Sequence, residues 1–271
     1  MVIKCTPIEK HGGVWVKRED LSCPSPGPAF SKVRGLASHM VNSTAIGFAC
    51  LDMATSKAGW GTAYLAKALG RGSIVYYPSL KEWEGQPGPY QRRAKQFGAE
   101  LRPLSPGRSS VLWYQARADL RGSPYIELLP NGLRLPETVV ETAEELLTVS
   151  RELLLGTIVV NVGSGTICSG VLTGLIEAGY NPSRMIGVTT HKVVAADKRK
   201  RILDKVCGAV MMVHDLPNWF SLVVTDCGYA DREDCPCPFP CNPWYDRKAW
   251  RWLVDNQTQL PEPILFWNIG A

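Results

Sequence analysis

The chain has 271 residues, of which 45% are hydrophobic and 20% charged, and its formal net charge at pH 7 is +5. This composition is typical of a globular protein and excludes a disordered chain, and no apolar run is long enough to cross a bilayer. The nine cysteines are odd in number and no secretory signal precedes them, which argues against a disulfide framework. We therefore expect a cytoplasmic protein without a membrane partner, whose mild positive charge permits a polyanionic partner without requiring one.

Strand and helix patterns alternate along the chain. In chain order we expect a strand and a turn over 14–21, a helix over 61–69, a strand over 73–77, a helix over 89–97, a strand over 100–104, a helix over 136–155, a strand over 157–162, a helix over 169–178, a strand over 185–190, a helix over 194–206, an irregular segment over 227–243, a helix over 246–256 and a strand over 264–267. This alternation implies βαβ units and a parallel sheet.

A glycine- and hydroxyl-rich turn follows the strand expected at 157–162. Its residues are Gly163, Ser164, Gly165, Thr166, Ile167, Cys168, Ser169 and Gly170, and we expect the first four to supply most of the contacts to a phosphate. The simpler alternative is an ordinary turn between a strand and a helix. A phosphate turn combined with Lys32, in the segment 30–36 of an α/β chain, predicts an enzyme that holds pyridoxal phosphate (PLP) on Lys32 as a Schiff base.

Several segments resemble one known family in the order in which they occur. They are 15–21 with 31–34 (Ser-Lys-Val-Arg), 56–59 (Ser-Lys-Ala-Gly), 163–170, 242–249 (Asn-Pro-Trp-Tyr-Asp-Arg-Lys-Ala) and 265–271. This set resembles the fold type II PLP enzymes of the tryptophan synthase β-subunit superfamily, and within them 1-aminocyclopropane-1-carboxylate (ACC) deaminase and D-cysteine desulfhydrase. The resemblance implies a homodimer and two three-layer α/β domains with mostly parallel sheets and PLP in the cleft between them. The larger domain would comprise 1–40 and 136–271, and the smaller 41–135.

The resemblance also assigns a role to each candidate residue. Lys32 would carry PLP and then act as the base at the α-carbon, Asp246 would face the pyridine nitrogen, and Tyr245 would transfer protons. Lys57 stands where the family has an asparagine that reaches the phenolic oxygen of PLP. Ser56 would contact the substrate carboxylate, and Ala58 and Gly59 would also bind the substrate.

Each of these roles has a structural alternative. Lys32 would otherwise be a surface lysine, Asp246 an acidic residue at a helix N-terminus, Tyr245 a core residue, and Ser56 a helix cap. The sequence also departs from the family at Lys57 and at Thr166, which stands where a glycine is usual. An ammonium at Lys57 would either stabilise the phenolate or compete for the aldehyde.

Cysteines cluster in the irregular segment 227–243. Cys227, Cys235, Cys237 and Cys241 are enough for a zinc site but lack paired Cys-x-x-Cys spacing, so we interpret them as free thiols and expect no metal. The four histidines, at 11, 39, 191 and 214, also lack the spacing of metal ligands.

Three functions remain open from the sequence. The leading hypothesis is a PLP-dependent lyase or deaminase of amino acid metabolism, which acts by elimination or deamination at the α-carbon of an amino acid or amine. The second is PLP-dependent modification, such as decarboxylation, of an amino acid attached to a nucleic-acid base. The basic run Lys198–Arg201 motivates this DNA-modification hypothesis, although a solvated helix face is the simpler interpretation of that run. The third is a PLP-binding relative that has lost catalysis.

Overall fold

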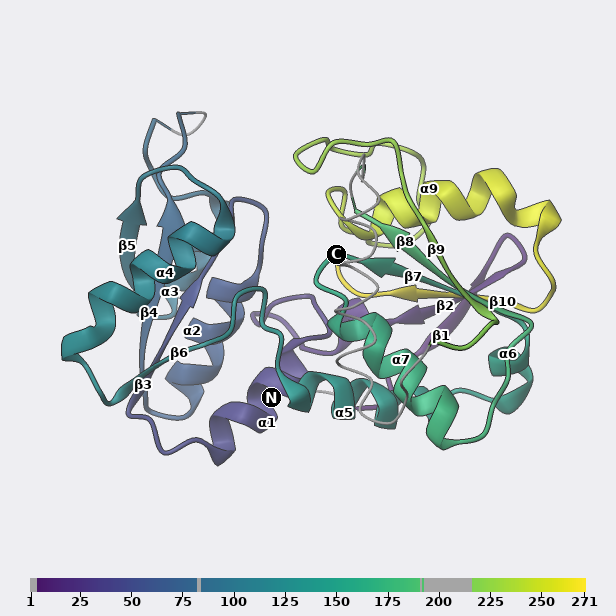
Figure 1. The fold of residues 1–271 in the computed structure, drawn as a ribbon, viewed down its shortest axis with the longest axis horizontal. Helices are drawn as coiled ribbons and strands as arrows, with labels where there is room; N and C mark the ends of the chain where they lie inside the picture. Colours follow the sequence, from purple (N-terminus) through teal and green to yellow (C-terminus); the bar gives the residue numbers. More distant parts are fainter. Residues whose placement is uncertain (1–3, 82–83, 191, 193–215) are drawn as a thin grey trace. The chain divides into compact units, whose positions relative to one another are not determined.

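The computed structural model describes residues 4–81, 84–190, 192 and 216–271, which form two compact units (Figure 1). The larger unit comprises the described residues of 1–24, 29–35 and 136–271, and the smaller comprises those of 25–28 and 36–135. Each unit is built around one sheet with helices on both faces, and all strand pairs except β1 with β2 are parallel. The predicted α/β class with mostly parallel sheets is confirmed. The domain boundaries stay a prediction.

The larger sheet has the strand order β1-β2-β10-β7-β8-β9. Its strands are β1 (Ile8–His11), β2 (Val14–Arg18), β7 (Thr157–Val162), β8 (Arg184–Thr189), β9 (Phe220–Val223) and β10 (Ile264–Asn268). All residues of β7 and β10 are buried, which explains why these strands read as nearly continuous apolar runs. Strand β10 pairs with β2 on one side and with β7 on the other, so it connects the β1–β2 pair to the β7–β8–β9 part of the sheet.

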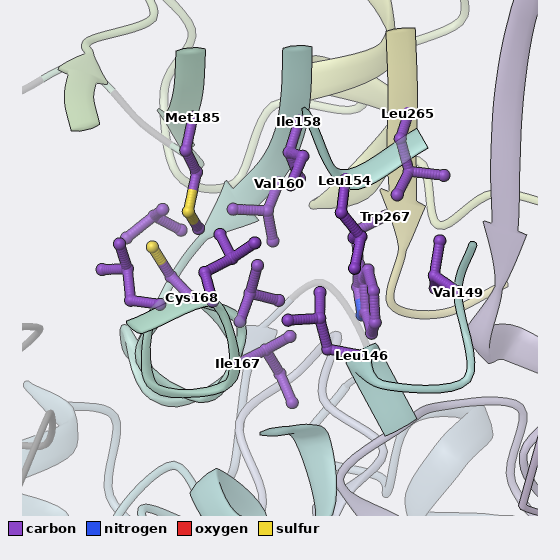
Figure 2. Packing of buried hydrophobic residues seen from close by; sticks show 14 of the residues in the cluster. Leu146, Val149, Leu154, Ile158, Val160, Ile167, Cys168, Met185, Leu265 and Trp267 are labelled. Atoms are coloured by element: carbon purple, nitrogen blue, oxygen red, sulfur yellow. The ribbon is translucent and has the colours of Figure 1, made fainter. Parts of the chain in front are cut away.

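Helices cover both faces of this sheet. On one face lie α5 (Pro136–Leu146), α6 (Arg151–Leu155) and α7 (Thr166–Glu177), and on the other lies α9 (Asp246–Asn256). Side chains of β7 alternate between the two cores, because Val160 packs with the α7 side and Val159 with the α9 side. Figure 2 shows the α7 side, where Val160, Ile167 and Trp267 belong to one cluster.

The smaller sheet has the strand order β5-β4-β3-β6. Its strands are β3 (Gly47–Leu51), β4 (Gly72–Pro78), β5 (Glu100–Leu104) and β6 (Ile126–Leu128). Helix α4 (Ser109–Asp119) packs on the face that carries Ile74 and Tyr76. Helix α2 (Ala58–Ala68) contacts Val75, whose side chain lies on the opposite face, and α3 (Pro89–Gln96) packs against α2.

Short elements complete the described chain. Helix α1 (Val33–Asn42) begins in the larger unit, and the three-residue 3₁₀ turns are η1 (Glu19–Leu21), η3 (Leu120–Gly122) and η4 (Gln257–Gln259). Among the described residues, no helix has both the length and the apolar character needed to cross a membrane.

Most predicted elements agree with the structure to within one residue at each end, and helix 61–69 begins three residues earlier than expected, at Ala58. The elements that the sequence patterns missed are β1, β3, β6, β9, α1 and α4. The helix expected over 194–206, with its basic run Lys198–Arg201, lies outside the described residues, as do His191 and His214.

Two further predicted helices were wrong in extent. The helix expected over 136–155 is two helices, because the Thr148 hydroxyl donates to the Glu145 carbonyl at 2.7 Å and Ser150 is extended before α6 begins. The helix expected over 169–178 begins three residues earlier, at Thr166. Gly170 therefore lies within α7 and not in the turn before it. A Cβ at Gly170 would lie 2.4 Å from Thr142 Cβ, so this glycine serves the packing of α7 on α5.

Candidate active site

The predicted phosphate turn joins β7 to α7 in the larger unit. Gly165 has a φ of +89°, a conformation that favours glycine, and α7 begins at the next residue. The first N–H groups of a helix have no acceptor within it and form its positive end. The hydroxyl oxygens of Ser164 and Thr166 lie 3.0 Å apart at this same end. Together these groups form a site suited to an anion.

Lys32 reaches this turn. Its Nζ donates a hydrogen bond to Ser164 Oγ at 2.9 Å. The backbone before it is fixed to the segment after β10, because the Ser31 N–H donates to the Ile269 carbonyl at 2.9 Å and Phe30 forms a bridge with Gly270. The structure thus brings the predicted lysine and the predicted phosphate turn into contact.

Asp246 is attached to the same segment. It is the first residue of α9, it is buried, and its Oδ1 accepts the Ile269 N–H at 3.1 Å. Ile269 therefore bonds through its N–H to Asp246 and through its carbonyl to Ser31, next to Lys32. Tyr245 precedes α9, and its hydroxyl lies 3.3 Å from that of Tyr229.

A buried ionic network lies beside Lys32. Arg34 pairs with Glu19, and its Nη1 lies 3.8 Å from Glu145, whose Oε1 is 2.6 Å from the Nζ of Lys17. Burial raises the pKa of Glu19. Burial also raises the pKa of Glu145, but the Lys17 hydrogen bond and the Arg34 charge outweigh it, so the pKa lies below its ordinary value. The charged residues around the predicted lysine thus fix the start of α1.

Two other lysines of the larger unit are held in structural roles. Lys17 is bound by Glu145 and by the Thr6 carbonyl, at 2.7 Å. Lys248 donates to the carbonyls of Thr190 and Gly228 at 2.9 and 2.8 Å, and burial lowers its pKa. Of these lysines and Lys32, it is Lys32 whose amine lies at the phosphate turn.

The remaining predicted residues lie in the smaller unit, where α2 begins. Ser56 Oγ accepts the Ala58 N–H at 3.1 Å, a bond to the second residue along the chain that is typical of a serine in a turn, while the N-cap of α2 is Lys57 and has no side-chain cap hydrogen bond. The buried Lys57 places its Nζ 5.3 Å from the centre of the Tyr90 ring. Gly59 lies so close to Asp52 that a Cβ would be 2.7 Å from Oδ2.

Asp52 was not predicted from the sequence. It follows β3, it is fully buried, and its Oδ2 accepts a hydrogen bond from Gln91 Nε2 at 2.8 Å. Burial raises its pKa to about 7, although hydrogen bonds from the Gly59 N–H and the Ser56 hydroxyl act in the opposite direction. The available signal was an acidic residue directly after a short apolar run, but that run was not recognised as a strand.

Asn161 is the second residue that the sequence patterns missed. It lies in β7, two residues before Gly163, and its buried Oδ1 accepts no hydrogen bond from the part of the chain that is described. A buried acceptor without a donor is costly, and a bound ligand that supplies the donor would account for it. With the anion site and the Lys32 amine, it makes the carboxyl end of β7 fit a phosphorylated aldehyde such as PLP.

The cysteine cluster has no metal-binding geometry in the described chain. Cys227, Cys235, Cys237 and Cys241 are free thiols. Across the described ranges, no three His, Cys, Asp or Glu side chains are placed to hold a metal ion.

The parallel α/β units, with a lysine at a phosphate turn, define a fold type II PLP enzyme. Residues 2–214 match the model of the family described as "Pyridoxal-phosphate dependent enzyme". The chain belongs to this family, and its cofactor is pyridoxal phosphate.

Individual relatives agree with this assignment. A protein of Pseudomonas phage M6, described as a glycyl-dTMP PLP-dependent decarboxylase, is 38% identical over 286 residues that cover 100% of both chains. The crystal structure of an ACC deaminase homologue has a TM-score of 0.81 at 20% identity and covers 99% of this chain and 90% of its own. Processed threonine deaminase isoform 2 from Solanum lycopersicum has a TM-score of 0.67 at 14% identity, with coverages of 98% and 83%. At these identities the two solved structures establish the fold alone, and they confirm the predicted fold type II resemblance.

Proposed function

We propose that this PLP enzyme removes the carboxylate, as CO₂, from a glycyl group attached to a thymidine nucleotide. The observation that carries the proposal is the 38% identity, over both full lengths, to a phage protein described as acting in this way. This agrees with the second hypothesis from the sequence, an amino acid attached to a nucleic-acid base. The elimination hypothesis has support only from structures that share the fold at 20% identity or less.

The chemistry of a glycyl group favours the same choice. PLP, when bound, takes up the electron pair of a bond broken at the α-carbon. A glycyl group has no leaving group on a β-carbon, so elimination is not open to it. Loss of CO₂ places the whole electron pair on the cofactor, which therefore has to be a strong electron sink.

Asp246 would strengthen that sink. A carboxylate that faces the ring nitrogen favours the protonated ring, because the ion pair stabilises the charged form. Its bond to Ile269 fixes Asp246 relative to the segment that carries Lys32 through a single residue. The geometry therefore supports the predicted role of Asp246.

The other candidate residues of the larger unit would hold the cofactor and return a proton to the substrate. The first N–H groups of α7 and the hydroxyls of Ser164 and Thr166 would bind the cofactor phosphate, with Gly163 and Gly165 leaving the backbone open to it. Lys32 would hold the cofactor covalently and, once released, return a proton to the α-carbon that has lost CO₂. Tyr245 stays the second proposed proton donor.

The roles of the smaller unit's residues stay proposals. Lys57 is assigned to the phenolic oxygen of the cofactor and Ser56 to the substrate carboxylate. Ala58 and Gly59 belong to the same proposal, but their N–H groups are hydrogen-bonded to Ser56 and Asp52 respectively. The Ser56 hydroxyl is engaged in the same network, through the Ala58 N–H and Asp52, so a contact of any of the three with the substrate would have to replace one of these bonds.

A product assay tests the proposed function. Purified holoenzyme is incubated with a glycyl-modified thymidine nucleotide, both as the free monophosphate and within an oligonucleotide, and CO₂, ammonia and the nucleoside product are measured. We expect one CO₂ and one amine product per turnover, without ammonia. Release of ammonia without CO₂ would support the deaminase hypothesis instead, and an unchanged substrate in both forms would contradict decarboxylation.

A further inference from the structure

Helices α2 and α3 of the smaller unit combine cations with aromatic rings. We call the set Trp60, Tyr64, Lys67, Tyr90, Arg93 and Phe97 the α2–α3 surface. The ring centres of Trp60 and Tyr90 are stacked 6.3 Å apart with an angle of 18° between the planes. The Arg93 guanidinium lies 5.9 Å from the centre of the Trp60 ring. These contacts hold the arginine over a ring and so reduce the entropy it loses when it binds.

The pattern repeats one helical turn further on. Lys67 Nζ lies 5.8 Å from the centre of the Phe97 ring, and Tyr64 meets the same ring edge-on at 5.4 Å. Cations of α2 and α3 are thus arranged in succession along the helix pair. The neighbouring Arg92 and Lys95 of α3 are also exposed.

No carboxylate of either helix offsets these charges. The sequences of α2 and α3 contain neither aspartate nor glutamate. Asp52 contacts both helices, through Gly59 and Gln91, but it is fully buried. The face thus presents positive charge to the solvent and is complementary to a polyanion.

The opposite face of the same sheet differs. Helix α4 carries Asp119, which forms an ion pair with Arg102 at 2.6 Å and accepts a hydrogen bond from Tyr76. The exposed arginines there, Arg117 and Arg121, provide matched controls because they remove the same charge from the other side of the sheet.

We propose that the α2–α3 surface binds the phosphate backbone of a DNA strand, so that the substrate of this enzyme is a modified nucleotide within DNA and not a free nucleotide. The inference rests on the proposed function for the identity of the substrate. The cations on the two helices are more numerous than one nucleotide phosphate can pair with, whereas a DNA strand has a phosphate at every nucleotide.

Salt-dependent binding tests this inference. The affinity of the holoenzyme for a fluorescent single-stranded oligothymidylate is measured by anisotropy over a range of salt concentrations. Arg92→Ala/Arg93→Ala is expected to weaken binding at least about tenfold at low salt and to lower the slope of log Kd against log salt by about 1.4, or ~0.7 per lost phosphate contact. The control Arg117→Ala/Arg121→Ala, on α4 and the adjoining η3, is expected to leave both quantities unchanged.

A third variant separates the effect of the ring that holds Arg93 from the effect of the positive charge. Trp60→Ala removes the ring under Arg93 but no charge, so we expect an affinity about two- to fivefold weaker with the salt slope unchanged. Circular dichroism and the near-visible cofactor band establish that each variant is folded and loaded.

The outcomes distinguish failure of the proposed DNA-binding surface from failure of the proposed decarboxylase function. The proposal that the α2–α3 surface binds DNA would be wrong if Arg92→Ala/Arg93→Ala left DNA binding unchanged. It would also be wrong if Arg117→Ala/Arg121→Ala weakened binding equally, or if binding fell only after neutralisation of the 198–201 run. Equal rates of CO₂ release from the free nucleotide and from the oligonucleotide would overturn it as well, while the proposed function would stand. If the α3 variant loses DNA binding but neither substrate yields CO₂, the surface stands and the proposed function falls.

Discussion

The partners of each lysine amine separate the roles of the lysines, and this gives a prediction at the scale of single residues. Lys17 and Lys248 are surrounded by carboxylate or carbonyl oxygens, whereas Lys32 contacts the hydroxyl of Ser164 in the phosphate turn. We expect Lys32→Ala to lose the near-visible absorption of the purified enzyme, because the variant lacks the amine that contacts the turn and would hold the aldehyde covalently. Absorption spectra of the two proteins after dialysis against buffer check this.

Lys57→Ala is the matched control for that spectrum. It removes a buried amine of the smaller unit, so the band should persist, with a shifted maximum if Lys57 contacts the phenolic oxygen. A band that survives in Lys32→Ala and disappears in Lys57→Ala would show that the lysine assignment is wrong.

We predict that Asp52 makes the free energy of unfolding depend on pH. Burial raises its pKa to about 7, whereas an unfolded aspartate titrates near ~3.9. Between these values the folded protein keeps a proton that the unfolded chain releases, so the contribution of Asp52 to the free energy of unfolding is full below pH ~4 and is lost as the pH rises through ~7. Asp52→Asn removes this titration, and the variant should therefore gain stability relative to the wild type on going from pH 5 to pH 8.

Urea unfolding of both proteins at the two pH values measures that difference. The comparison between proteins cancels the titration of every other group. The same difference in unfolding free energy at pH 5 and pH 8 would mean that Asp52 is ionised in the folded protein across this range.

At the scale of elements, the phosphate turn depends on how α7 packs against α5. A Cβ at Gly170 would lie 2.4 Å from Thr142 Cβ and 2.8 Å from the Val139 carbonyl oxygen, so α7 would have to move away from α5. We expect Gly170→Ala to lower the free energy of unfolding by about 1–3 kcal/mol and to weaken cofactor binding, since the shifted helix begins with the phosphate turn. Chemical denaturation and PLP titration measure the two effects.

Gly122→Ala is the corresponding control. A Cβ at Gly122 meets no atom within 4 Å, so the unfolding free energy should change by less than about 0.5 kcal/mol. Equal stabilities of the Gly170 and Gly122 variants would contradict the close packing of α5 and α7.

At the scale of the whole molecule, Lys32, the phosphate turn and Asp246 all belong to the larger unit. A ligand that binds only the native state stabilises it by about 2.7 kcal/mol at 100 times its Kd. We therefore expect saturating PLP to slow hydrogen exchange most strongly in β7, α7 and β10, and least in α4 and β6. Hydrogen exchange with mass spectrometry, with and without PLP, tests this, and equal protection of both units would contradict it.

How much could be predicted from the sequence depended on whether a feature is local. Strand β7 is rich in Ile and Val, and the turn after it has its own glycine signature, so both were found. Strand β3 (Gly47–Leu51) has no β-branched residue and was missed, and Asp52 was missed with it. The packing role of Gly170 depends on residues distant in the chain, and so does the oxygen of Asn161, which has no donor among the described residues; no local pattern contains either feature.

Strand β10 lies between β2 and β7, although it follows both of them in the sequence. A ribosome makes it after every other strand of the larger sheet, so a nascent chain holds β2 and β7 without the strand that pairs with both. Ile269, whose carbonyl binds the Ser31 N–H and whose N–H binds Asp246, is made directly after β10. The proposed loading of the vitamin B6 cofactor at Lys32 therefore has to wait until the ribosome has made β10 and Ile269, because these residues fix the backbone next to Lys32.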